Sequence, residues 1–135
     1  MNCFNSETFL NEAVQSVISQ TYNNWELVFW DNKSTDNSSK IIKSFNDKRI
    51  KYYYANKHTK LYESRNMAIE KCSGELVTFL DCDDIWEKNK LQKQVAMVNL
   101  GAQVVYGDFE LIDENNSKSS KNAYRTSKQK ITNLL

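Results

Sequence analysis

The sequence predicts an α/β protein with a mostly parallel sheet flanked by helices. Short apolar runs typical of strands alternate along the chain with segments of helical periodicity. This alternation is typical of units in which a helix connects two parallel strands. In addition, two acidic segments, residues 31–36 and 81–84, each follow directly after an apolar run. Ligands of such sheets bind outside the carboxyl ends of the strands, so these two segments also predict where a site lies.

Each element is predicted from its own pattern. Helices are expected where apolar residues recur every three to four positions, and strands where apolar runs are short. The first helix has Ser6 as its predicted N-cap. The predicted helices are residues 7–20, a segment ending near residue 45, residues 62–72 and residues 88–100. The predicted strands are residues 25–30, 50–54, 75–80 and 102–106, with residues 109–112 expected to pair nearby.

The last part of the chain differs in composition. Residues 113–130 are polar, rich in Ser, Lys and Asn, and show little periodicity, which is typical of a linker. Residues 131–135 are apolar again, as at the start of a new element. We therefore expect a domain over residues 1–112, followed over residues 113–135 by a linker and the beginning of a further part.

Composition excludes several classes of protein. The 135 residues suffice for one modest core, and a net charge of +1 gives no broad field for nucleic acid. No apolar run approaches the roughly 20 residues of a membrane span, and no signal peptide is visible. The cysteines, Cys3, Cys72 and Cys82, form no CxxC pair, which suits a reducing cytoplasm. A cytoplasmic location is expected, with peripheral attachment at the inner face of the membrane left open.

The acidic segment after residue 80 suits a hard cation. Asp81, Asp83 and Asp84 fall within four positions. Mg²⁺ or Mn²⁺ is often held by one or two carboxylates and keeps other positions for phosphate oxygens, such as those of a nucleotide diphosphate. The plainer alternative is a solvated turn in which Asp84 caps the next helix.

Three further polar residues each allow two interpretations. Asp31 is either a turn acid or an acceptor for a ligand N–H, such as a uracil imide. Arg65 is either a surface cation near Glu63 or Glu70, or a contact to phosphate or base. His58, the only histidine, is interpreted as a surface residue, since no second metal ligand or triad partner is evident.

Taken together, these segments resemble the inverting family 2 glycosyltransferases, which have a GT-A fold. The resemblance covers most of residues 3–113, and its motifs come in the order and at the spacing of the family. They are C-F-N-S-E at residues 3–7, S-V-I-S-Q-T-Y at 16–22, D-N-K-S-T-D-N at 31–37, S-R-N at 64–66, S-G-E at 73–75, F-L-D-C-D-D at 79–84 and K-L-Q-K-Q at 90–94.

The resemblance implies a Rossmann-like nucleotide-sugar-binding fold and a specific reaction. A sugar would pass from a nucleotide-diphosphate sugar, with a UDP-sugar favoured, to a hydroxyl of a saccharide or glycolipid acceptor, with inversion at the anomeric carbon. A base would deprotonate the acceptor, while Mn²⁺ or Mg²⁺ would carry the charge of the departing diphosphate.

The resemblance also implies the roles of individual residues. A nucleoside pocket is expected at the start of the chain, and the later motifs surround the base, the phosphates and the sugar. The implied nucleotide-sugar-binding residues are Phe4, Asn5 and Glu7 in the nucleoside pocket, Asp31 facing the base, Arg65 beside the base or phosphates, and Asp81 with Cys82 near the ribose or sugar. The implied metal ligand is Asp83, with Asp84 as a second candidate.

The sequence departs from the family at three places. Asn32 and Lys33 replace the usual Asp-Gly, and Lys33 lacks glycine's freedom at positive φ, so loop geometry and base preference are open. Only residues 1–4 can stand in for the first strand, which predicts lost stability or an exposed sheet position and makes self-association unsurprising. No residue matches the family's catalytic base, and Asp108 is not assigned that role. We therefore expect a donor-binding portion, incomplete at both ends.

Other functions remain as alternatives. Asp81 and Asp83 approach the nucleophile and general acid of haloacid-dehalogenase-like phosphatases, although Ile85 departs from that motif and no downstream acidic pair is evident. A non-catalytic nucleotide-sugar-binding module or inactive fragment would bind the donor without transfer. A purely structural role predicts that Asp83→Ala leaves ligand affinity unchanged.

Overall fold

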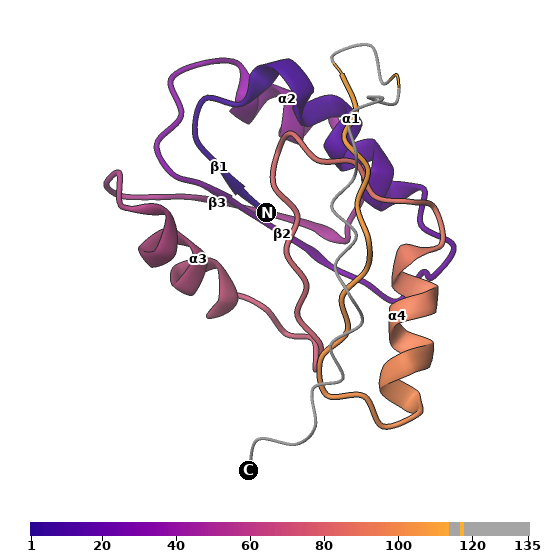
Figure 1. Ribbon diagram of the computed structural model, residues 1–135. Helices are drawn as coiled ribbons and strands as arrows, with labels where there is room; N and C mark the ends of the chain where they lie inside the picture. The colour runs from indigo at the N-terminus through magenta and orange to yellow at the C-terminus, as the bar shows by residue number, and fades with distance from the viewer. Residues whose placement is uncertain (114–116, 118–135) are drawn as a thin grey trace. The chain divides into compact units, whose positions relative to one another are not determined.

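The computed structural model describes residues 1–113 and residue 117, and the chain divides into two compact units, Met1–Ala96 and Met97–Leu135. In the first unit, three parallel strands form one sheet in the order β1-β2-β3 (Figure 1). The strands are β1 (Asn2–Cys3), β2 (Leu27–Asp31) and β3 (Ile50–Tyr54). The helices are α1 (Glu7–Ile18), α2 (Ser38–Ser44), α3 (Leu61–Ile69) and α4 (Lys90–Asn99), the last of which begins in the first unit and ends in the second. The predicted α/β fold class is confirmed.

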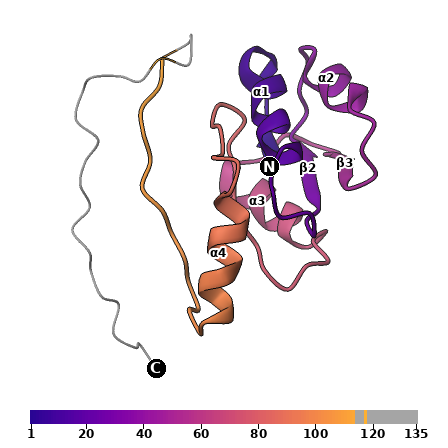
Figure 2. The same cartoon turned by 90° about the vertical axis from the view of Figure 1, so that its right-hand side faces the viewer.

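The central strand β2 is buried on both faces of the sheet. Leu27 and Phe29 belong to a core cluster with residues of α1 and α2, whereas Val28 and Trp30 pack with Ala68 of α3. Accordingly, α1 and α2 lie on one side of the strands and α3 on the other (Figures 1 and 2). Burial of a large apolar side chain such as Phe29, which is 0% exposed, stabilises the fold by roughly 1.5–3 kcal/mol.

Two predicted strands are wrong. Residues 75–80 and 102–106 form neither a helix nor a strand. A strand requires a partner edge, and β1, with two residues, offers residues 75–80 almost none. Their apolar side chains Leu76, Val77 and Phe79 are about half exposed, at 55%, 48% and 52%. Only at Leu80 does this segment enter the core beside α1 and α2.

The second unit contains little regular structure among residues 97–113 and 117. Regular structure among these residues consists of the end of α4 and an isolated bridge at Ile112. The expected strand pairing of residues 109–112 is therefore reduced to one position. Most of the predicted linker lies outside the described residues, and the predicted boundary after Ile112 stays a prediction. None of the helices described has the length and apolar character needed to cross a membrane.

Candidate functional site

The loops that carry or adjoin Phe4, Asn5, Glu7 and Asp31 meet where the parallel strands end. The backbone N–H of Asn32 donates to Cys3 O at 2.8 Å, and that of Ala55 donates to Asp31 O at 2.8 Å. The loops after β1, β2 and β3 therefore leave the sheet side by side, at its carboxyl edge. Residues 4–7, 32–37 and 55–60 form this edge, the part of a parallel sheet where ligands bind.

Asn5 joins the loop after β1 to the loop after β2. Its side-chain oxygen accepts the N–H of Thr35 at 2.8 Å, and its own N–H donates to Ser34 Oγ at 3.1 Å. Asn5 has a φ of 50°, a left-handed conformation that asparagine tolerates better than most residues. The preceding side chain, Phe4, is left 48% exposed at the edge.

Glu7 and Asp36 fix the starts of α1 and α2 to each other. Asp36 Oδ2 accepts the N–H of Glu7 at 3.0 Å, and Glu7 Oε2 accepts both the backbone and the side-chain N–H of Asn37 at 2.8 Å. The predicted N-cap, Ser6, makes no capping hydrogen bond with its side chain. A carboxylate at a helix start accepts unpaired N–H groups. Asp36 therefore caps the start of α1, and Glu7, the first residue of α1, caps the start of α2.

Asp31 is buried, and both of its carboxylate oxygens accept hydrogen bonds from within the fold. Its side chain is 0% exposed; Oδ1 accepts the N–H of Ser34 at 2.7 Å and Oδ2 accepts the hydroxyl of Tyr52 at 2.8 Å. Burial, and then this hydrogen bond, raise the pKa of Tyr52. A contact from Asp31 to a base would have to share these partners, and it stays a prediction.

The unusual residues of the loop after β2 have defined roles. Asn32 makes three hydrogen bonds to Thr59: its Nδ2 donates to the carbonyl at 2.7 Å, and its Oδ1 accepts from the backbone N–H and the hydroxyl at 3.1 Å each. Lys33 has a φ of 74°, the region that favours glycine, and its Nζ lies 5.0 Å from the ring centroid of Tyr54. The loop therefore keeps the conformation of a glycine turn with a lysine in place.

His58 is exposed, as predicted, but it is fixed to this edge. Its Nδ1 lies 2.9 Å from the carbonyl oxygen of Asn32, and its ring packs against Phe4 with a centroid separation of 4.2 Å and an interplanar angle of 52°. The sequence pattern missed this pair. The available signal was that the only histidine falls in the loop between a predicted strand and the helix that carries Arg65.

Arg65 reaches from α3 to the acidic segment. Its Nη2 donates to Asp81 Oδ1 at 2.7 Å, and its guanidinium lies 5.8 Å from the ring centroid of Phe79. The sequence left open a pairing with Glu63, but that side chain accepts the N–H of Lys60 at the start of its own helix. The structure thus brings together Arg65 and Asp81, two residues that the sequence separates by 16 positions.

The remaining acids form an exposed turn. The N–H of Asp84 donates to Asp81 O at 3.3 Å, while the thiol of Cys82 is buried and donates to Asn2 O at 3.2 Å. Burial, and then the charges of Asp83 and Asp81, raise the pKa of Asp84. Over residues 1–113 and 117, no three His, Cys, Asp or Glu side chains converge as a metal cage. One or two carboxylates with diphosphate oxygens nevertheless suit Mg²⁺ or Mn²⁺, and Asp83 and Asp84 fit that arrangement.

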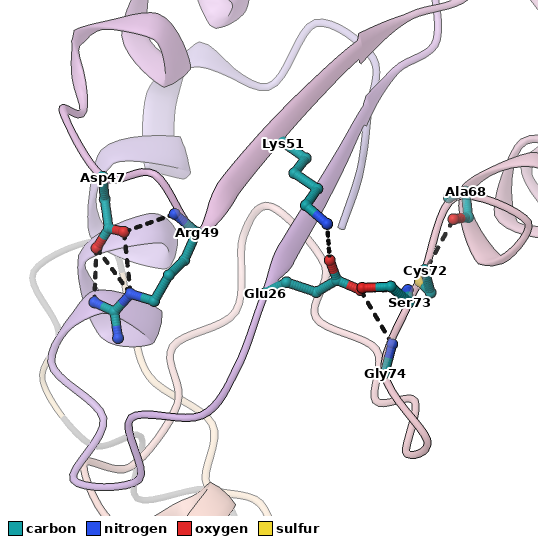
Figure 3. A network of polar contacts seen from close by, with 8 residues as sticks. All are labelled: Glu26, Asp47, Arg49, Lys51, Ala68, Cys72, Ser73 and Gly74. Carbon is teal, nitrogen blue, oxygen red and sulfur yellow. Dashed lines mark hydrogen bonds and ion pairs between the residues drawn. The ribbon is translucent and has the colours of Figure 1, made fainter.

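A second polar network positions the chain that leads to the acids (Figure 3). Glu26, just before β2, binds Lys51 and accepts the N–H and hydroxyl of Ser73 and the N–H of Gly74. The hydrogen bond from Lys51, and then that from Ser73, lower the pKa of Glu26 to about 2. No local sequence pattern indicates Glu26, because its partners are 25 to 48 positions away.

Comparison with known proteins identifies the family. A family model described as "Glycosyl transferase family 2" matches residues 1–134. The chain belongs to this family. The phosphatase alternative is therefore set aside.

Curated relatives agree with this assignment. The chain is 38% identical over 117 residues to the UDP-Glc:alpha-D-GlcNAc-diphosphoundecaprenol beta-1,3-glucosyltransferase WfgD of Escherichia coli, covering 85% of this chain and 46% of that one. It is 35% identical over 94 residues to the putative teichuronic acid biosynthesis glycosyltransferase TuaG of Bacillus subtilis, covering 68% and 37%. The chain thus spans less than half the length of these relatives.

A solved structure supports the GT-A fold. TarS 1–349 of S. aureus superposes with a TM-score of 0.70 at 27% identity, covering 73% of this chain and 31% of that chain. TarS 1–349 in complex with UDP-GlcNAc gives a TM-score of 0.71 at 24% identity, covering 82% and 38%. The expected Rossmann-like GT-A fold is confirmed.

Proposed function

We propose that this chain forms the donor-binding portion of a glycosyltransferase. The enzyme transfers a sugar from a UDP-sugar to a hydroxyl of a saccharide or glycolipid acceptor, with inversion and with the help of a divalent cation. The observation that carries the proposal is the Arg65–Asp81 pair, in which the predicted phosphate contact is bound at 2.7 Å by the first residue of the acidic turn. The name of the E. coli relative and the TarS complexes with UDP and UDP-GlcNAc point to the same donor class.

Each side chain has a task in this proposal. Phe4 presents an exposed ring for the nucleoside, while Asn5, Glu7 and Asp31 hold the loops around it. Arg65 supplies a guanidinium for the diphosphate, a group that it binds in bidentate fashion. Asp81 keeps Arg65 in place and leaves its second carboxylate oxygen for a sugar or ribose hydroxyl. Cys82 contributes through its backbone, since its thiol faces the core.

Asp83 and Asp84 would hold Mn²⁺ or Mg²⁺. When bound, such a cation supplies positive charge that stabilises the departing diphosphate. The turn that carries both acids is exposed at residues 81, 83 and 84, so a phosphate-bearing ligand can reach it. The general base is not assigned to any residue of this chain.

The finer expectations about partners belong to the same proposal. We infer a cytoplasmic location with attachment at the inner face of the membrane, where a glycolipid acceptor would be found. Self-association would use the half-exposed apolar side chains Leu76, Val77 and Phe79.

Calorimetric titration of UDP into the purified chain, with and without Mn²⁺, tests the proposal. We expect Mn²⁺ to increase the affinity for UDP by at least tenfold. In Asp83→Ala, the affinity for UDP in the presence of Mn²⁺ should fall to that of the parent without metal. Glu75→Ala, which removes another exposed carboxylate, is the matched control and should bind as the parent does. A folded parent chain that binds no UDP under either condition would contradict the proposal. Binding without any transfer by the full-length enzyme would favour a non-catalytic module.

A further inference from the structure

Recognition of a uracil imide N–H requires an exposed hydrogen-bond acceptor, and Asp31 does not present one. Its carboxylate is 0% exposed, and both oxygens accept hydrogen bonds from within the chain. The ring of Phe4, in the predicted nucleoside pocket, is exposed at the same edge of the sheet. The side chain packed against that ring is His58.

The hydrogen bond of His58 determines which ring nitrogen is free. Nδ1 lies 2.9 Å from the carbonyl oxygen of Asn32, and a carbonyl oxygen only accepts. Nδ1 therefore carries the hydrogen, and in the neutral imidazole Nε2 is left with a lone pair. Because His58 is exposed, that lone pair is available to a ligand lying beside Phe4.

The loop that carries His58 is held in place before any ligand arrives. Asn32 fixes the next residue, Thr59, by three hydrogen bonds, and Thr59 is 9% exposed. The same Asn32 supplies the carbonyl that orients the imidazole. A side chain fixed in this way loses little conformational freedom on binding, which favours selective recognition.

We propose that Nε2 of His58 accepts the imide N–H of a uracil base that packs against the ring of Phe4. The inference rests on the proposed donor site and assigns its base selectivity to a residue of the loop after β3. The imide nitrogen of uracil carries a hydrogen, whereas the corresponding nitrogen of cytosine carries a lone pair. His58 therefore favours UDP over CDP, because two lone pairs would face each other with cytosine.

Titrations of UDP and CDP into the parent chain, His58→Phe and Lys57→Ala test this assignment. His58→Phe keeps an aromatic ring beside Phe4 and removes the acceptor. We expect it to weaken UDP about tenfold, the effect of one hydrogen bond, while CDP changes little and the dependence on Mn²⁺ persists. Lys57→Ala alters the neighbouring exposed side chain and should keep the parent's ratio of UDP to CDP affinity. An unchanged ratio in His58→Phe would overturn the assignment and leave the donor site standing.

Nuclear magnetic resonance gives a second readout that a purely structural role would not move. The chain has a single histidine, so long-range ¹H–¹⁵N spectra contain one imidazole. We expect a ring hydrogen on Nδ1, where the carbonyl oxygen of Asn32 accepts it, and a shift of the Nε2 signal on adding UDP but not on adding pyrophosphate. An Nε2 signal that stays fixed while UDP binds would overturn the assignment. A parent chain that binds no UDP would overturn both this assignment and the proposed function.

Discussion

Arg65 and Asp81 form an ion pair at 2.7 Å that links α3 to the acidic turn. Both side chains are well exposed, at 34% and 52%, so solvent screens the pair and it contributes about 1 kcal/mol or less to folding. Its importance lies in position, because it holds a guanidinium beside the carboxylates proposed to bind a cation.

Replacing Arg65 should therefore affect the ligand more than the fold. We expect Arg65→Ala to change the free energy of unfolding by less than about 1 kcal/mol and to weaken UDP by roughly tenfold or more. Arg65→Lys keeps the charge but not the planar guanidinium, so its affinity for UDP should lie between those of the parent and Arg65→Ala. Urea denaturation and calorimetry measure both quantities. Marked destabilisation with unchanged UDP affinity would assign Arg65 to the fold alone.

Asn32 should be one of the most sensitive residues of the edge. Asn32→Ala leaves the buried backbone groups of Thr59 without their partners, and we expect it to cost about 2–4 kcal/mol of stability. Asn56→Ala, a nearby exposed asparagine, is the matched control and should cost less than about 0.5 kcal/mol. Equal free energies of unfolding for the two variants, from chemical denaturation, would contradict the role of Asn32 in fixing Thr59.

Lys33 tests how much its backbone conformation costs. At a φ of 74°, Lys33→Gly should stabilise the chain by up to about 1 kcal/mol, less the loss of its contact with the ring of Tyr54. Lys33→Ala keeps the unfavourable φ and loses that contact, so it should destabilise the chain. The order of midpoints in thermal denaturation should be Gly above Lys above Ala. A glycine variant that melts below the alanine variant would argue against this backbone conformation.

Glu26 should make stability depend on pH in the acid range. Its pKa is lowered from 4.5 to about 2 in the folded chain, so the folded state favours the charged carboxylate. The resulting stabilisation, about 1–2 kcal/mol after allowing for solvent, is complete above pH 4.5 and is lost as the pH falls toward 2. Glu26→Gln should thus be less stable than the parent at pH 6, with the difference closing toward pH 2. A difference that stays constant with pH, in urea titrations at several pH values, would refute this role.

Elements defined by local pattern could be predicted from the sequence. The strand at residues 50–54 has the predicted bounds, and the first helix, predicted over residues 7–20, covers Glu7–Ile18. Residues 75–80 look equally strand-like, yet they form no strand because pairing depends on a neighbouring edge, and β1 provides two residues. A single-sequence pattern carries no information about the length of that edge.

In the candidate site, too, local motifs indicate some residues, and tertiary contacts determine the rest. The Arg65–Asp81 pair brings together residues of two separate motifs, and the expectation that Phe4 shares a site with them stays a prediction. The burial of Asp31 and the packing of His58 against Phe4 depend on tertiary contacts that no spacing reveals. The departures at Asn32 and Lys33 marked the loop where these contacts occur.

The most direct test of the donor site is to map UDP binding onto the backbone by NMR, with Mg²⁺ present. We predict amide shift changes at residues 4–7, 32–34, 58, 65 and 81–84. We predict none around Glu26 and Asp47, which precede β2 and β3 at the opposite end of the sheet. Shift changes that cluster around Glu26 and Asp47 instead, or a complete absence of shifts in the folded chain, would contradict the account.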